Sequence, residues 1–266
     1  MGFRLGDFAF DRIQLGIAEN FNDEILYGLF QLADATIDVT AESQDFNDKD
    51  GNLIRRIWKS KGGTFTANNA MLNVNILAAS SGNPLAISMK DKILEMPKIE
   101  LVDAGSTITL TDAVEGTIKV AGAYANGATG DNYVLGSAAS ATEFSYDKTT
   151  KVLTPPSVTG EGAPTKFMVI YQTKADGYKV ANTVDKFPET IKLTLKALYV
   201  DPCLKGYVRP AYIVLPSFQP SPEASVATAT DTQLEYKGDL QVDYCGSEKA
   251  LYYIYFPDEQ TQDVAA

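Results

Sequence analysis

The strongest constraint on the fold is a strict alternation of apolar and polar residues in the last third of the chain. Between residues 233 and 244 the apolar side chains alternate with charged and amide side chains, so the two sets face opposite sides of one strand. The same period recurs at residues 191–197, and bounded apolar runs lie at residues 212–215 and 251–256. We therefore expect four strands of an antiparallel sheet with one buried and one wet face. Residues 216–229 contain three prolines and are expected to form a loop or an edge.

The amino-terminal third predicts an arm, a helix and a long hairpin. Residues 1–19 lack a helical stripe and predict an extended arm. An N-cap signal at residues 22–24 precedes apolar positions from Ile25 to Leu32, which predicts a short amphipathic helix weakened by Gly28. At residues 36–41 the period changes to two and indicates a half-buried strand. The polar stretch 42–52 ends in the turn dipeptide Asp50-Gly51, and apolar and basic residues follow, so a hairpin with a polar tip is expected.

The middle of the chain divides it into three parts. Residues 68–82 favour a second helix, because Met71, Val74, Leu77 and Ala78 have helical spacing, although residues 72–76 alternate well enough to allow a strand. The following region is rich in Ala, Gly, Ser and Thr, which predicts short strands and loops with little bulk for a core. We expect residues 1–102 and 178–266 to form the two halves of one β-domain, and residues 103–177 to form a small β-rich insertion in it.

Composition excludes several classes of function. The 266 residues include 34 acids and 23 basic residues, a formal charge of -11, which disfavours binding to nucleic-acid phosphates or anionic lipid. The chain has no histidine, so His-based acid–base chemistry and the triads that use it are not available. The sequence has no apolar run long enough for an export signal or a membrane span. We expect a soluble protein made in the cytoplasm, with Cys203 and Cys245 reduced and each more plausible as a small buried hydrophobe than as half of a pair.

Motifs for catalysis or cofactor binding are not found in the sequence. A calcium-loop reading of residues 45–51 fails, because it puts Phe46 at the first ligand position and Ile57 where the bidentate Glu belongs. An irregular divalent site at this hairpin tip stays open beside the simpler interpretation of a solvated turn. Two acids placed for glycoside hydrolysis are also possible among the 34 acids. A carbohydrate cleft is usually lined with aromatic residues, however, and the single tryptophan, Trp58, lies in a strand flanked by Arg and Lys, where packing is its expected role. We expect no enzyme, no cofactor and no metal.

Several segments together resemble the tail tube proteins, or major tail proteins, of tailed bacteriophages. These segments are the extended arm, the strand and hairpin from Ile37 through Gly51, the following residues 59–64, and the helix start at residues 68–72. In the carboxy-terminal half the resemblance continues at residues 186–194 and 212–216, so that it covers about two-thirds of the chain. Residues 103–177 are less well matched. The resemblance is one of pattern, without a chemical signature.

The resemblance implies a structural virion protein with a β-sandwich or barrel-like subunit and one or two short helices. Such subunits form stacked hexameric rings around a channel, and DNA passes through it without specific binding. It implies as partners other copies of the chain, the tape measure and tail terminator proteins, and a sheath protein where the tail has one, but no membrane. The inter-ring contact falls on the hairpin tip: Asp45, Phe46, Asn47, Asp48, Lys49, Asp50 and Gly51.

Charge in the carboxy-terminal strands agrees with such a conduit. From Glu223 to residue 266 the chain contains nine acids and only two lysines. An acidic channel wall would repel DNA phosphates and let the DNA slide instead of holding it. We expect Glu235, Asp239 and Asp243 to face the channel. The alternative is a capsid-decoration or adhesin-like binding module, with the Gly/Ala/Thr-rich middle as its recognition domain. The arm and the long hairpin count against it, because both would be left without a partner.

Overall fold

The chain forms two compact units. The computed structural model describes residues 6–89, 93–201, 208–223, 225–226, 233–244 and 248–257. The first unit, which we call the barrel unit, comprises residues 1–85 and 180–266, and the second, the insertion, comprises residues 86–179. Cys203 and Cys245 lie outside the described residues.

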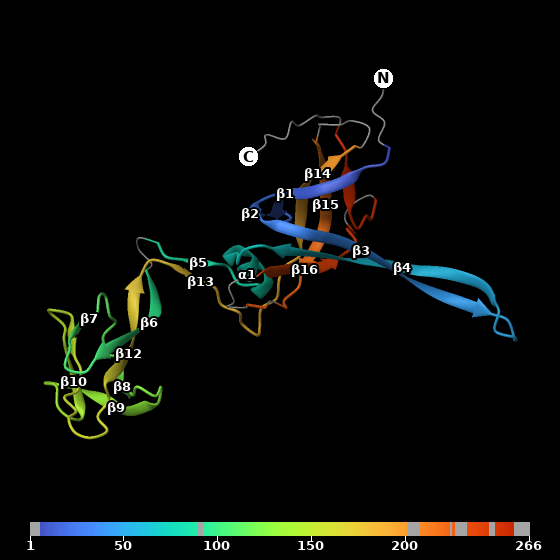
Figure 1. Ribbon diagram of the computed structural model, residues 1–266. Coiled ribbons are helices and arrows are strands. Elements are labelled where there is room, and N and C mark those ends of the chain that lie inside the picture. The colour runs from blue at the N-terminus through green and yellow to red at the C-terminus, as the bar shows by residue number, and fades with distance from the viewer. Residues whose placement is uncertain are drawn as a thin grey trace. The chain divides into compact units, whose positions relative to one another are not determined.

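Eight strands form one antiparallel, nearly closed sheet in the barrel unit (Figure 1). Their order is β2-β1-β14-β15-β16-β4-β3, and β17 also pairs with β15. The mainly β fold predicted from the sequence is confirmed, with strands at all four places where the carboxy-terminal pattern put them. The strands are β1 (Ala9–Glu19), β2 (Ile25–Leu29), β3 (Leu32–Asn47), β4 (Leu53–Asn69), β14 (Ile191–Val200), β15 (Val208–Pro220), β16 (Leu234–Leu240) and β17 (Tyr253–Tyr255).

Aromatic rings fill the centre of this sheet. The centroids of Phe65, Phe218 and Tyr236 lie 5.6–6.4 Å apart in edge-on or tilted contacts. The Phe218 ring occupies the place where a side chain at Gly238 would lie, which explains why a glycine interrupts the apolar face of β16. The hydroxyls of Tyr236 and Tyr27 are hydrogen-bonded at 2.8 Å, and burial raises the pKa of Tyr27 to about 12. The core thus satisfies its buried polar atoms at this point.

The helix predicted at residues 25–32 is wrong, because this segment contains β2. Asn20 accepts hydrogen bonds from the backbone N–H groups of Asn22 and Glu24, and Asp23 has a positive φ of 61°. The apparent N-cap residues therefore build a hairpin turn. Pairing of β2 with β1 then overrides the helical spacing, with Gly16 opposite Leu29. Residues 9–19 are extended, as predicted, but they do not form a free arm, because they pair with β14 and β2 as a strand of the barrel wall.

The second predicted helix is confirmed, although it begins later than residue 68. α1 (Val74–Ser81) starts after Asn73, whose side chain accepts from the N–H of Asn75, and ends at Gly82 in the left-handed conformation. The backbone of Phe187 lies against Gly82, so a side chain there would also clash. α1 covers part of the barrel core through Ile76. Within the described residues, no helix has the length and apolarity needed to cross a membrane.

The expectation that residues 216–229 form a loop is wrong for their first part. β15 continues to Pro220 and pairs there with Gly238. Pro216 is tolerated because the register between β14 and β15 shifts at that point: Leu193 lies opposite Leu215 and Ile191 opposite Phe218. An irregular register removes the need for an N–H donor at the proline.

The insertion has a sheet and an apolar core of its own. Its strand order is β6-β12-β8-β9-β10-β11-β7, and β6 pairs with β12 from Leu94 to Asp103. The unit therefore begins before the predicted residue 103. Phe144, Phe167 and Tyr171 are buried in it, so the expectation of little core bulk is wrong. The strands are β5 (Ala86–Ile87), β6 (Leu94–Asp103), β7 (Ile108–Thr109), β8 (Lys119–Ala123), β9 (Thr129–Gly136), β10 (Glu143–Asp147), β11 (Val152–Thr154), β12 (Lys166–Ala175) and β13 (Tyr178–Lys179).

Candidate functional site

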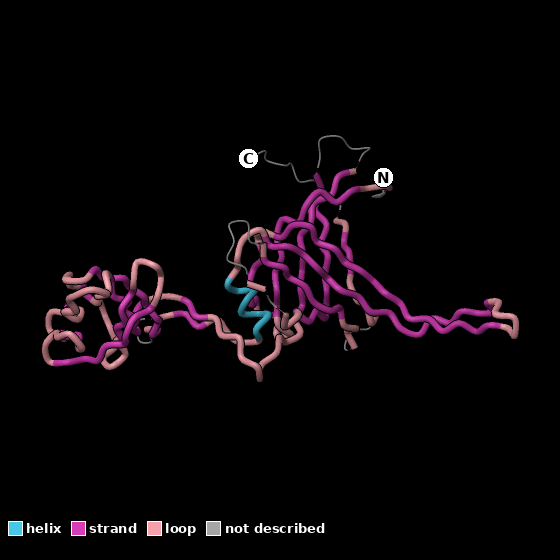
Figure 2. The backbone as a smooth tube through the Cα atoms, turned by 60° about the horizontal axis from the view of Figure 1, so that its bottom comes forward, coloured by secondary structure: helices cyan, strands magenta, loops and turns pink. Residues whose placement is uncertain are grey.

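The hairpin of β3 and β4 extends far beyond the rest of the barrel sheet (Figure 2). β4 pairs with β16 only between residues 63 and 69, and β3 pairs only with β4. The distal half of the hairpin, residues 38–62, which we call the ribbon, is therefore a two-stranded structure without a third strand beside it. A two-stranded hairpin is marginal in water unless something packs against it.

The ribbon tip is a turn built by Asp48. Its carboxylate accepts from the N–H groups of Asp50 and Asn52 and from the Asn52 side-chain amide, at 2.8–3.0 Å, and these bonds hold the pKa of Asp48 below its ordinary value. Gly51 supplies the positive φ of 84° that the turn requires. Within the described ranges, no group of three or more Asp, Glu, Cys or His residues is arranged to hold a metal ion.

One ion pair links the two ribbon strands. Arg56 donates to both carboxylate oxygens of Asp45, at 2.7 and 2.9 Å, and the arginine holds the pKa of Asp45 below its ordinary value. The guanidinium of Arg56 also lies 5.8 Å from the centre of the Trp58 ring. The ribbon is thus locally ordered by polar contacts on one face.

Both faces of the ribbon carry exposed apolar side chains. Trp58 shares a face with Arg56 and is 62% exposed, and Ile54, at a register shift of β4, is 70% exposed. Phe46 and Ile57 lie on the opposite face and are also exposed, as is Leu53 beyond the register shift. Within the described structure nothing covers either face, which marks the ribbon as a contact surface.

The structure brings the predicted contact residues 45–51 together at the ribbon tip, and the ribbon turns out to be larger than predicted. The sequence analysis expected packing as the role of Trp58 and gave no role to Ile54 and Ile57. The half-buried strand expected at residues 36–41 is also mostly exposed, with Val39 open to solvent. The available signal was the charge around these residues: apolar residues interleaved with Arg55, Arg56 and Lys59 cannot all enter a core.

The acids predicted to face a channel are only partly brought together. Leu234, Tyr236 and Leu240 are buried while Glu235 and Asp239 are exposed, so these two acids share the outer face of β16. Lys237 lies between them and bonds Glu235 at 3.4 Å and Glu223 at 3.2 Å, contacts that raise the pKa of Lys237. Asp243 follows the end of the strand, so the alternation does not place it on that face.

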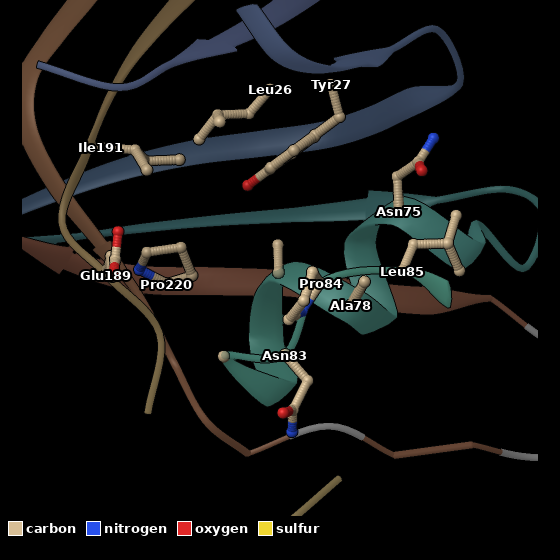
Figure 3. A pocket seen from close by; sticks show the side chains of 12 residues that line it. Leu26, Tyr27, Asn75, Ala78, Asn83, Pro84, Leu85, Glu189, Ile191 and Pro220 are labelled. Carbon is tan, nitrogen blue, oxygen red and sulfur yellow. The ribbon is translucent and has the colours of Figure 1, made fainter. Parts of the chain in front are cut away.

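A pocket of about 410 Å³ lies between α1, β2 and the chain around Ile191 (Figure 3). Its lining is mostly apolar, and Glu189 is its one carboxylate. General acid–base chemistry needs a second ionisable partner near neutrality, whereas the other ionisable lining group, Tyr27, has its pKa raised to about 12. The pocket therefore has no pair of groups suited to acid–base chemistry, and we take the ribbon as the candidate functional site.

Comparison with known proteins gives one family match. A model of the YomU/Tube protein family matches residues 13–252, a range that includes the ribbon, most of the barrel unit and the whole insertion. The chain matches none of the curated proteins with which it was compared. Because the family match spans most of the 266 residues, the chain belongs to the YomU/Tube protein family.

Proposed function

We propose that the chain is a subunit of the tail tube of a tailed bacteriophage. In this proposal, copies form stacked hexameric rings around a channel for DNA, and the protein resides in the virion tail. Membership of the YomU/Tube protein family supports a tube protein. The observation that carries the proposal is the ribbon, because it exposes apolar side chains on two faces and has no partner within the described chain.

The two apolar faces explain why stacking would order the ribbon. Burial of one large apolar side chain contributes about 1.5–3 kcal/mol, and the ribbon carries six that are exposed: Val39, Phe46, Leu53, Ile54, Ile57 and Trp58. In a single copy this energy is not available, so the ribbon should open more readily than the barrel. Contact with a neighbouring ring on both faces would supply it.

An acidic wall suits passage of DNA. Of the 34 acids and 23 basic residues in the chain, the insertion holds 11 and nine, so most of the excess negative charge lies in the barrel unit. We place the outer face of β16, with Glu235 and Asp239, on the channel wall, and Asp243 near it. Phosphates would be repelled there, and DNA would not be retained.

The proposed role requires no reaction. The tube would act without a catalytic residue, cofactor or metal, and its partners would be other copies, a tape measure protein, a tail terminator protein and, in a contractile tail, a sheath. The insertion would project outward from the tube and make no ring contact.

A second candidate function is a decoration or adhesin-like binding module. The outer face of the insertion sheet favours it, because Ile99 and Ile170 lie opposite each other on β6 and β12 and are exposed, with Leu101 beside them. In that case the insertion, and not the ribbon, would carry the binding surface.

Negative-stain electron microscopy of the purified full chain tests the two proposals. Stacked rings or hollow tubes support the tail tube, whereas monomers or trimers at every concentration support the binding module. A second variant replaces residues 86–179 with a short Gly-Ser linker, which is feasible because the ends of the gap are close: the Asn83 side chain donates to the carbonyl of Ala181 at 2.9 Å. Tubes should still form, and their loss would place the insertion in the ring contact.

A further inference from the structure

The two strands of the β3–β4 hairpin carry opposite charges. β3 has four acids, Asp34, Asp38, Glu42 and Asp45, and no basic residue. β4 has four basic residues, Arg55, Arg56, Lys59 and Lys61, and no acid. If β3 and β4 paired only with each other, each strand could carry both acidic and basic residues. The separation of acids and bases onto different strands therefore indicates a further partner for each strand.

Pairing within one hairpin neutralises only part of these charges. Asp45 and Arg56 lie opposite each other and form an ion pair, and Glu42 lies opposite Ser60, whose hydroxyl donates to it. Within the described part of the chain, no ion pair joins Arg55, Lys59 or Lys61 to an acid. The remaining basic residues of β4 therefore have no carboxylate partner inside the described subunit.

The ribbon also has two free edges. From Asp38 to Asn47, β3 pairs only with β4, and from Leu53 to Gly62, β4 pairs only with β3. Each edge presents unpaired backbone N–H and C=O groups. Charged side chains normally protect a free edge against pairing with an identical edge, and here the charges differ in sign: the β3 edge is acidic, whereas the β4 edge carries Lys59 and Lys61. Each edge would therefore repel an identical edge and could accept a strand of opposite charge.

We propose that the ribbons of neighbouring copies within one ring pair edge to edge, with the acidic β3 strand of one copy against the basic β4 strand of the next. This inference rests on the proposed tube function and names the partner of the ribbon edges as a second copy. Rotation around a ring axis keeps all ribbons pointing the same way, so β3 of one copy meets β4 of the next and runs antiparallel to it. The new pairing would repeat the pairing within each hairpin.

Charge complementarity selects this arrangement over its alternatives. Side chains opposite each other on adjacent strands interact, and opposite charges there are favourable while like charges are unfavourable. Pairing β3 with β3, or β4 with β4, would place acids against acids or bases against bases. Pairing β3 with β4 is head-to-tail, the type of contact that closes into a ring. The apolar faces would remain available for contacts between rings.

The test uses two charge variants of the full chain. One leaves only basic charges on the two ribbon strands (Asp38→Lys, Glu42→Lys, Asp45→Lys), and the other leaves only acidic charges on them (Arg55→Glu, Arg56→Glu, Lys59→Glu, Lys61→Glu). Each variant alone should form at least tenfold fewer rings than the parent in negative stain, because every ribbon would repel its neighbour. An equimolar mixture should restore rings, since basic and acidic ribbons can alternate. Circular dichroism of each variant monitors the barrel.

Three outcomes separate this inference from the proposed function. If the parent forms neither rings nor tubes, the proposed function fails and the inference fails with it. If the parent forms rings but either variant alone does so equally well, or the mixture restores nothing, only the edge pairing is overturned. If the ribbon contacts a surface other than a neighbouring ribbon, mixing the basic and acidic variants should not restore rings.

Cysteine cross-linking tests the same pairing without altering the charge pattern strongly. A chain with Glu42→Cys is mixed with a chain with Lys59→Cys and oxidised, and the parent treated in the same way gives the background from Cys203 and Cys245. A panel with the β4 cysteine at Arg55, Ser60 or Lys61 covers other registers. We expect a covalent dimer of the two different chains with at least one β4 position. Dimers of the Glu42→Cys chain alone, or no dimer in any mixture, would contradict the proposal.

Discussion

The inner strands of the barrel and the distal ribbon have the same secondary structure but place their apolar side chains in different environments. On β14, the apolar residues Ile191, Leu193 and Leu195 alternate with polar residues and are buried. On the ribbon, Ile54 and Trp58 are exposed although they too lie in a paired β-strand. The comparison shows that β-strand formation and burial are separate properties, and that a strand exposed on both faces indicates a surface completed by another molecule.

The largest expected effect is on the barrel side of this comparison. Phe218 is fully buried between the rings of Phe65 and Tyr236. Phe218→Ala should lower the free energy of unfolding by about 3–5 kcal/mol, because it leaves a cavity in a closed core. Urea denaturation followed by circular dichroism measures this change.

The matched control is Trp58→Ala on the ribbon. Trp58 is the larger side chain, but it is 62% exposed, so the free energy of unfolding should change by about 0.5 kcal/mol or less. Tube formation should be impaired instead. A loss of stability comparable to that of Phe218→Ala would show that the ribbon is covered within a single copy and would break the comparison.

A smaller effect is expected from the buried hydroxyl pair. Tyr236→Phe leaves the Tyr27 hydroxyl buried without its partner, and the free energy of unfolding should fall by about 1–3 kcal/mol. The double variant Tyr27→Phe, Tyr236→Phe removes both hydroxyls and should be more stable than the single variant. If the single variant is as stable as the parent, the Tyr27 hydroxyl has found another partner.

The difference between the two regions also explains how much of the structure the sequence could predict. Where one face is buried, as at Leu234, Tyr236 and Leu240, a period of two determines both the strand and its orientation. The long hairpin and its Asp50-Gly51 turn were predictable because local turn chemistry determines them.

Other features depend on contacts that no local pattern contains. Residues 25–29 have spacing that fits a helix, and only their pairing with β1 makes them a strand. The insertion boundary was misplaced because β6 pairs with β12, which lies more than sixty residues further along the chain. On the ribbon, exposure of Ile54 and Trp58 could not be deduced from their apolar character, because the same residue types fill cores.

Removing the ribbon tip should separate folding from assembly. Deletion of residues 45–51 should change the free energy of unfolding of the barrel by about 1 kcal/mol or less, because no barrel core residue is removed. Gel filtration and negative stain should show a folded protein that no longer polymerises into tubes. Tubes of normal length from this variant would contradict the assignment of the tip to stacking.

A charge reversal on β16 tests whether the exposed face of this strand lines the channel. The triple variant Glu235→Lys, Asp239→Lys, Asp243→Lys should alter stability by about 1 kcal/mol or less, since exposed charges contribute little. Its tubes should retain DNA in low salt and release it in high salt, measured by co-sedimentation. The control has the same change in net charge on the insertion, at the exposed residues Asp131, Glu161 and Asp176. Equal DNA retention by control and variant would rule out a specific role for the β16 face.

The smallest expected effect is a pH dependence confined to the ribbon. Hydrogen bonds from Arg56 lower the pKa of Asp45 below its ordinary value of 3.8. Because the folded pKa is the lower one, the contribution of this carboxylate is complete above pH 3.8 and is lost as the pH falls through the folded pKa. Both side chains are exposed, so the overall stability should hardly change. An NMR titration of the Asp45 carboxyl group should show its midpoint rising toward the ordinary value in Arg56→Gln. Asp48 is the internal control, because Asn52 and backbone amides lower its pKa, and its midpoint should stay low in that variant; an unchanged Asp45 midpoint would show that the ion pair does not form in solution.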